Sequence, residues 1–347
     1  MVSVYFCTNR NPLRTSIVNN FGTDFNPAPA MITYGVADVR SIKREGDLSE
    51  QNISVDDLTG DTFSPEIQEA IQDGPDHLLI SVHGFDYRFR EAVMRTAWLI
   101  DWFKRGTPSL RTNAILFSWP SLGSLTPEAY EADWDRATGS SGAFRLFFNA
   151  MVPLIRDFKA AKTSRRVSLL AHSMGNHALA SGLASTIGSA PGQHPPGGTP
   201  LFDRVVLAAA DEDGDALSRI DRLACLQQLA ERTYVYYNNQ DVPLLSFSRL
   251  LHGSSRLGID GPPDKPRFRG LNYTFVNCSA ANPNTNDDPT DPQGHQYYRL
   301  VPEVRDDICG VFSGALDDTL PNRTYRDAEN YYRLDCKPRT TPERFFP

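Results

Sequence analysis

The most informative segment for the fold is residues 167–176, Val167-Ser168-Leu169-Leu170-Ala171-His172-Ser173-Met174-Gly175-Asn176. An apolar strand pattern enters this stretch, and a helical pattern leaves it after Gly175. Ser173 therefore falls on a tight strand-to-helix turn, which lifts its hydroxyl above the edge of a sheet. Ala171 and Gly175, two residues before and after it, are small, as close approach of the strand and helix backbones requires. This context predicts that Ser173 is a nucleophile.

Short β-rich apolar runs alternate with helical patterns along most of the chain. The inner runs are apolar almost throughout, which is typical of strands buried on both faces of a parallel sheet. The pattern predicts an α/β fold, with a mostly parallel eight-stranded sheet and helices on both faces. The predicted strands are Val2–Cys7, Met31–Ile42, His77–His83, Asn113–Trp119, Arg166–Ala171, Arg204–Ala209, Thr233–Tyr237 and Tyr273–Asn277, and helices are predicted over Phe89–Lys104, Asn176–Ile187 and Leu217–Ala230.

An aromatic stripe between the fourth and fifth predicted strands has helical spacing. Phe144, Phe147, Phe148, Met151 and Ile155 recur at i, i+3, i+4, i+7 and i+11, on one face of a helix. The favoured interpretation is a helix packed on the sheet. The alternative is the apolar face of a lipase lid.

Composition excludes several classes of function. The 347 residues carry 35 Lys and Arg against 42 Asp and Glu, so the net charge is −7 and no basic tract suits nucleic acid. No apolar run is long enough for stable membrane insertion, and the N-terminus resembles a strand more than a signal peptide. Five scattered cysteines favour a reducing compartment, so a cytoplasmic protein is expected. The oligomeric state does not follow from the sequence.

No repeat or composition break divides the chain into two large parts. We expect a single domain over residues 1–320, with loop insertions around 189–200 and 253–294, and a C-terminal tail over 321–347. Asp287, Asp288 and Asp291 crowd the second insertion, but their spacing matches no calcium loop, and a solvated loop is the favoured interpretation.

Four short blocks carry a resemblance to a known family. They are Tyr34-Gly35-Val36-Ala37, Val82-His83-Gly84-Phe85, Phe117-Ser118-Trp119-Pro120-Ser121 and His172-Ser173-Met174-Gly175-Asn176. Together they resemble a bacterial α/β-hydrolase family of unknown function, over roughly residues 1–315 and in the same order. The chain departs from the superfamily's nucleophile elbow where Ala171 replaces the first glycine, and one methyl group is the smallest possible change.

The resemblance implies a catalytic triad in the chain order serine, acid, histidine. His295 fits as the base because it follows the last predicted strand, whereas its rival His252 precedes that strand. Asp241 fits as the acid because it follows the strand Thr233–Tyr237. The competing acids form the cluster Asp211-Glu212-Asp213-Gly214-Asp215, in which Asp213 is the strongest candidate.

The oxyanion hole implied by the superfamily needs two backbone N–H groups. Met174 supplies one at the start of a helix, and Phe85 supplies the other from the block His83-Gly84-Phe85. Gly84 lets this backbone turn sharply. Trp119 ends a strand on the same sheet edge, where its indole either lines the substrate pocket or belongs to the core.

The resemblance implies a serine hydrolase that cleaves carboxylic esters through an acyl-enzyme, with a small acyl ester as its substrate. No cofactor and no metal are expected. The alternatives on the same triad are amidase, thioesterase and acyltransferase activity. A phospholipase-type effector and a non-catalytic binding protein are weaker alternatives.

Overall fold

The computed structural model of the chain describes residues 1–13, 20–26, 32–42, 47–49, 51–187, 199–281 and 294–337. His194, Asp287, Asp288 and Asp291 lie outside the described residues. So do most of the insertion predicted around 189–200, the end of the insertion at 253–294 and the last ten residues of the predicted tail.

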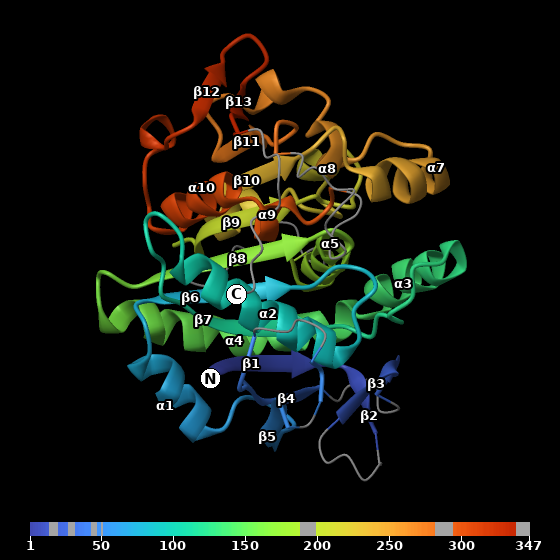
Figure 1. Cartoon of the computed structure of the whole chain (residues 1–347), viewed down its shortest axis with the longest axis vertical. Helices are drawn as coiled ribbons and strands as arrows, with labels where there is room; N and C mark the ends of the chain where they lie inside the picture. The colour runs from blue at the N-terminus through green and yellow to red at the C-terminus, as the bar shows by residue number, and fades with distance from the viewer. Residues whose placement is uncertain are drawn as a thin grey trace.

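Strands and helices alternate through most of the chain (Figure 1). The strands are β1 (Val2–Thr8), β2 (Arg10–Leu13), β3 (Asn20–Phe25), β4 (Thr33–Val39), β5 (Ile53–Thr59), β6 (His77–Val82), β7 (Asn113–Ser118), β8 (Arg166–His172), β9 (Phe202–Ala208), β10 (Ala230–Tyr237), β11 (Tyr273–Asn277), β12 (Arg323–Arg326) and β13 (Tyr331–Leu334). The α-helices are α1 (Pro65–Asp73), α2 (Phe89–Lys104), α3 (Pro127–Gly139), α4 (Ser141–Ala161), α5 (Gly175–Ile187), α6 (Leu226–Leu229), α7 (Arg249–His252), α8 (Leu257–Asp260), α9 (Tyr297–Leu300) and α10 (Pro302–Phe312). Short 3-10 turns are η1 (Ala216–Ser218), η3 (Lys265–Phe268) and η5 (Asp317–Thr319), and η2 (Leu244–Ser248) is a π-helical turn.

The large sheet has eleven strands in the part of the chain that is described, in the order β12-β13-β11-β10-β9-β8-β6-β7-β1-β4-β5. Neighbours from β1 to β13 are parallel, whereas β4, β5 and β12 pair antiparallel at the edges. The α/β class is confirmed, and all eight predicted strands lie in this sheet. The count of eight is wrong because β5, β12 and β13 are edge strands with polar sequences, and one-sided burial gives them no continuous apolar run.

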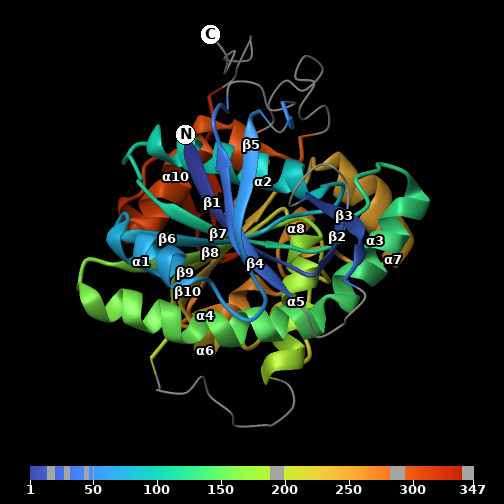
Figure 2. The ribbon, with the colours of Figure 1, turned by 90° about the horizontal axis from the view of Figure 1, so that it is seen from below.

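Both faces of the sheet are covered, as the apolar strands predict. Leu78 and Ile80 of β6 point into one core, and Leu79 between them points into the other. Figure 2 shows α2 and α10 on one side of the sheet, with α4, α5 and α6 on the other. The parallel strands therefore end in loops along one common edge, where β6, β8 and β10 deliver the blocks of interest.

Of two helical predictions, the one for the aromatic stripe is confirmed and the one for residues 217–230 is wrong. The aromatic stripe lies on α4 and packs on the sheet, since the ring of Phe117 on β7 is 5.1 Å from Phe144 and 5.2 Å from Phe147. The lid alternative for this stripe is therefore wrong. The helix predicted over Leu217–Ala230 is also wrong: turns separate η1 from α6 there, with loop hydrogen bonds such as Leu223 N–H to Ala216 O.

Candidate active site

Ser173 lies on a sharp turn between β8 and α5, at the edge where the parallel strands end. Its φ angle of +52° is in the left-handed region, which costs a residue with a side chain about 1–2 kcal/mol. Backbone bonds hold the turn, because the Ser173 N–H donates to Ala208 O at 3.0 Å and the Asn176 N–H donates to Ser173 O at 2.9 Å. A strained serine between a strand and a helix is the geometry of a nucleophile elbow.

Two glycines allow the loop after β6 to approach this turn. A Cβ at Gly175 would lie 2.5 Å from the carbonyl oxygen of His83, so even alanine would clash with backbone. A Cβ at Gly84 would lie 2.9 Å from the Cβ of Ser173. The loop that follows β6 is therefore in direct contact with the serine turn, as the small residues in both blocks require.

The two predicted oxyanion residues flank the same point. Phe85 follows Gly84 and is half-buried, and Met174 follows Ser173 and has no exposed surface. Within the described residues, neither backbone N–H has a hydrogen-bond acceptor. Met174 also precedes the first turn of α5, where the helix dipole favours negative charge. This is an arrangement that can stabilise an oxyanion, and the roles of both residues stay predictions.

Trp119 contacts the loop His83-Gly84-Phe85, which we call the oxyanion loop after its predicted role. Its indole N–H donates to the carbonyl oxygen of His83 at 2.8 Å, and the two rings stack with centroids 5.1 Å apart. Burial, with a contribution from Arg10, lowers the pKa of His83 to about 3, so its imidazole is neutral. Because Trp119 has no exposed surface, its position favours the core alternative over contact with substrate.

His295 and Asp241 lie together at this edge, far apart in sequence. The Nδ1 of His295 is 2.7 Å from Oδ2 of Asp241, and the carboxylate is fully buried while the imidazole is 12 % exposed. The other carboxylate oxygen, Oδ1, accepts the Leu244 N–H at 3.1 Å. Asp241 thus holds the imidazole in the orientation that a general base needs.

The loop around His295 is fixed by neighbours that sequence analysis did not find. The Asn238 amide donates to the Gly294 carbonyl at 3.3 Å, and Nε2 of His172 lies 3.3 Å from the His295 carbonyl. Burial, reinforced by the charge of His295, holds the pKa of His172 well below its usual range. Neutral His172 can therefore donate this bond.

Gln296 also links the histidine loop to the oxyanion loop, since its amide donates to the Tyr87 hydroxyl at 3.1 Å. Tyr87 and Gln296 are 209 positions apart, and no local pattern joins them. The contacts of Asn238, His172 and Gln296 all depend on the tertiary fold, so the sequence holds no signal for them.

The rival acid and base occupy different positions. Asp211 accepts from the Tyr130 hydroxyl at 2.7 Å and pairs with Arg256 at 2.8 Å. Although burial raises the pKa of the Asp211 carboxyl, Arg256 and the bonding hydroxyls lower it below its usual value. His252 lies against Trp134, with ring centroids 4.1 Å apart. The structure therefore brings His295 to Asp241, and the cluster at 211–215 serves another set of partners.

No cluster of three or more His, Cys, Asp or Glu side chains that could hold a metal ion occurs in the described ranges. Within those ranges there is also no helix long and apolar enough to cross a membrane.

Comparison with known proteins gives a family. No curated protein matches the chain. The family described as "Alpha/beta hydrolase of unknown function (DUF900)" matches residues 61–310, well over half of the chain. This match includes the serine turn, the oxyanion loop, Asp241 and His295, and it confirms both the predicted fold and the predicted resemblance. The chain belongs to this family of α/β hydrolases.

Proposed function

We propose that the protein is a serine hydrolase that cleaves carboxylic esters through an acyl-enzyme. Ser173 is the nucleophile, His295 the general base and Asp241 the acid that orients it. The observation that carries the proposal is the 2.7 Å contact between His295 Nδ1 and Asp241 Oδ2, on the sheet edge that also bears the strained serine turn. His172, which precedes Ser173, lies 3.3 Å from the His295 carbonyl through its Nε2, and the three residues follow the superfamily's chain order of serine, acid and histidine.

The reaction follows from these positions. Ser173 Oγ forms a bond to the ester carbonyl carbon while its proton passes to His295. The N–H groups of Met174 and Phe85 stabilise the oxyanion of the tetrahedral intermediate. The intermediate collapses, the alcohol leaves with the proton from His295, and the acyl group remains on Ser173. Water then attacks the acyl carbon and gives a proton to His295. This second tetrahedral intermediate collapses, the proton passes from His295 to Ser173 Oγ, and the carboxylic acid leaves.

Ester cleavage is the part of the proposal that rests on the superfamily, since amide and thioester cleavage use the same triad. A panel of p-nitrophenyl esters, the matching thioesters and anilides assigns the bond by kcat/KM. We expect the ester to be the preferred substrate.

A fluorophosphonate probe tests the nucleophile directly. Wild type should be labelled and should turn over p-nitrophenyl esters, whereas Ser173→Ala should do neither. Ser181→Ala is the matched control, because Ser181 is a buried serine on α5, the helix that follows Ser173, and its loss should leave both signals intact. Labelling that survives in Ser173→Ala would overturn the proposal.

A further inference from the structure

A cluster of rings beside Ser173 has no part in the triad. We call it the aromatic wall, and it consists of Phe85, Tyr130, Trp134, Phe247 and His252. Tyr130 is at its centre, with ring centroids 5.5 Å from Phe85, 6.3 Å from Trp134, 6.3 Å from Phe247 and 6.0 Å from His252. Tyr130 is buried, and the other four rings are half-buried and therefore partly accessible.

The aromatic wall begins next to the serine turn. The Asp211 N–H donates to the Ser173 carbonyl at 3.1 Å, and the Asp211 carboxylate accepts from the Tyr130 hydroxyl at 2.7 Å. Phe85, at the other end, follows the glycine that touches the Ser173 side chain. A substrate whose carbonyl lies at Ser173 is therefore next to the Phe85 end of the aromatic wall, from which the other rings continue through Tyr130.

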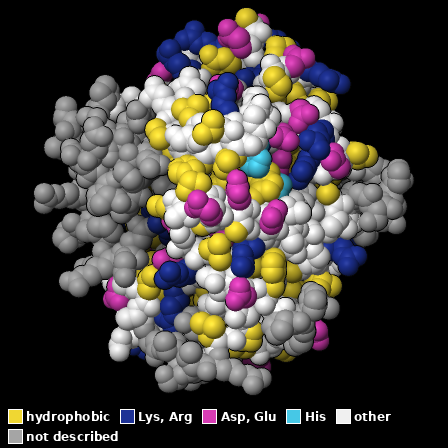
Figure 3. Space-filling model, turned by 90° about the vertical axis from the view of Figure 1, so that its right-hand side faces the viewer, with side chains coloured by type: hydrophobic (Ala, Val, Ile, Leu, Met, Phe, Trp, Pro, Cys, Tyr) yellow, Lys and Arg dark blue, Asp and Glu magenta, His cyan; other side chains and the backbone are white. Residues whose placement is uncertain are grey.

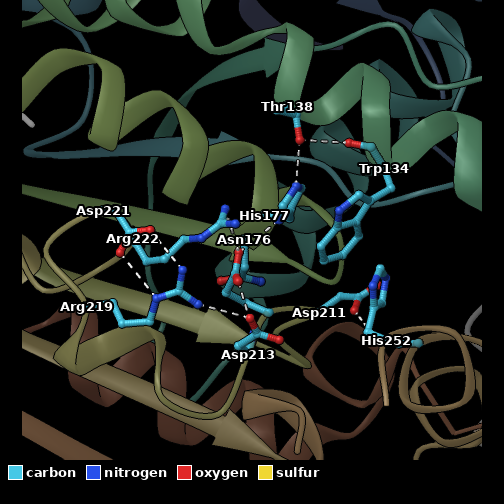
Figure 4. Close-up of polar contacts among 12 residues, drawn as sticks. Trp134, Thr138, Asn176, His177, Asp211, Asp213, Arg219, Asp221, Arg222 and His252 are labelled. Carbon is cyan, nitrogen blue, oxygen red and sulfur yellow. Dashed lines mark hydrogen bonds and ion pairs between the residues drawn. The ribbon is translucent and has the colours of Figure 1, made fainter. Parts of the chain in front are cut away.

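The charges behind the wall are paired within the protein. Arg256 is fully buried and binds Asp211 at 2.8 Å and Asp213 at 2.7 Å. Figure 4 shows Trp134 and His252 beside one another, next to Asp211. Burial, with the charge of Arg256, lowers the pKa of His252, so this imidazole is neutral near pH 7. The aromatic wall therefore presents rings to a ligand, because the charged side chains behind it, Asp211, Asp213 and Arg256, are paired with one another.

An exposed apolar surface continues from the aromatic wall along residues 242–251. Val242, Leu250 and Leu251, on the segment that carries Phe247 and His252, are 44 %, 80 % and 41 % exposed. Figure 3 looks at the face where the strands end and shows hydrophobic side chains beside the histidines that reach the surface, with acidic side chains among them. Along the aromatic wall itself an uncharged group is favoured, because Arg256 is already paired with Asp211 and Asp213 and a charged group would lose water without gaining a partner there.

We propose that the aromatic wall binds an uncharged aromatic ring of the substrate, on the acyl or the alcohol side of the ester. The inference rests on the proposed function, which puts the ester at Ser173. Flat rings suit this surface because edge-to-face and offset contacts between rings add stabilisation beyond the area buried. A cation is disfavoured, since the Arg256 guanidinium already lies 5.2 Å from the centroid of Trp134.

Matched aryl and cyclohexyl esters test this proposal. Ethyl benzoate is compared with ethyl cyclohexanecarboxylate, and benzyl acetate with cyclohexylmethyl acetate, so each pair differs in flatness and not in size. Binding to Ser173→Ala is measured by ligand-observed NMR, and kcat/KM is measured for wild type. We expect one aryl ester to be preferred by about fivefold in both measurements, and the preferred pair identifies the side of the ester that the wall binds.

Two variants show whether the aromatic wall is responsible. Phe247→Leu and His252→Leu, each in the Ser173→Ala background for binding, keep an apolar side chain and remove a ring, so the aryl preference should fall to less than about twofold. Tyr325→Leu is the control, because this ring is 44 % exposed on the distant edge strand β12. Thermal unfolding verifies that each variant is folded.

The outcomes separate this inference from the proposed function. Equal binding of aryl and cyclohexyl esters, or a preference that survives both wall variants, would overturn the inference even if the fluorophosphonate labels Ser173. A missing label with a persistent aryl preference would overturn the proposed function and leave the aromatic wall as a binding site.

Discussion

Two histidine–carboxylate pairs lie within the same sheet edge, and they differ in access. His295 is 2.7 Å from Asp241, and His177 on α5 is 3.0 Å from Glu212. The imidazole of the first pair is 12 % exposed, whereas both side chains of the second are 1 % exposed. His177 also uses its second nitrogen, because Nε2 lies 2.8 Å from the Thr138 hydroxyl.

Pairing with a carboxylate does not by itself make a histidine suitable as a general base. His177 has Trp134 stacked on it at 3.5 Å and joins α5, α3 and the loop after β9, so its bonds stabilise the fold. His295 follows β11 in the chain, and its imidazole is partly exposed on the face where the parallel strands end. We call His295–Asp241 the open pair and His177–Glu212 the sealed pair. We expect the open pair to control turnover and the sealed pair to control stability.

Amide substitution of each carboxylate separates the two pairs most strongly. Asp241→Asn should lower kcat by about 10³–10⁴, because the amide no longer stabilises the imidazolium and favours the wrong tautomer of His295. Glu212→Gln, the matched control, should change kcat by less than about threefold. Steady-state kinetics with a p-nitrophenyl ester measures both. Full activity in Asp241→Asn would return the acid role to the cluster at 211–215.

Removing the carboxylate of Glu212 should lower the stability of the folded protein. In Glu212→Ala the His177 Nδ1 and the Asp213 N–H, which bind Glu212 at 3.0 Å each, lose their partner. The free energy of unfolding should fall by about 1–3 kcal/mol, measured by urea denaturation. Glu231→Ala, which removes an exposed partner of Arg204, should cost less than about 0.5 kcal/mol. A loss of kcat as large as that of Asp241→Asn would contradict the division.

Another buried histidine, His77, should control how stability depends on pH. His77 is bonded to Thr112 at 2.8 Å and Ser168 at 3.0 Å, and burial, with the charge of Arg166, lowers its pKa to about 3. Below its ordinary pKa of 6.5 the unfolded chain takes up a proton that the folded protein refuses. The stability contribution is therefore complete above pH 6.5 and shrinks as pH falls, by about 1.4 kcal/mol per pH unit.

Urea denaturation of wild type and His77→Gln at pH 7, 5.5 and 4.5 measures this dependence. The other buried histidines contribute equally to both proteins, so the difference between the two reports on His77. The stability difference between wild type and His77→Gln should shrink as the pH falls. Parallel curves for the two proteins would mean that His77 does not resist protonation in the folded state.

The parallel core of the fold could be predicted because its physics is local. Strands buried on both faces, such as Val205–Ala208, need continuous apolar runs, and a helix packed on them needs a periodic stripe. Strands β12 and β13 could not be predicted, since both are short and polar, and Tyr332 and Arg333 of β13 gain their partners on β11 only in the folded chain. The segment at 217–230 has helical spacing, but its backbone bonds close turns instead.

The site divides in the same way. Ser173, Asp241 and His295 could be named because strand order fixes which loops meet at one edge, and the structure brings Asp241 and His295 together. Their catalytic roles stay predictions. The aromatic wall could not be found, because Tyr130 and His252 come from segments 122 positions apart that meet only in the folded chain. Side chains that support a loop, such as Trp119, carry no sequence signal that distinguishes them from the core.

Substitution of Trp119, which contacts the oxyanion loop, should change kcat less than substitution of Asp241. Trp119→Phe keeps a ring against His83 and removes the N–H that binds the His83 carbonyl at 2.8 Å. The loss of one such bond, about 1 kcal/mol, should loosen the loop that carries Phe85 and lower kcat about fivefold with little change in KM. Trp102→Phe, a fully buried tryptophan on α2, is the control and should leave kcat unchanged. If instead KM rises while kcat holds, Trp119 contacts substrate after all, and the indole faces the pocket during turnover.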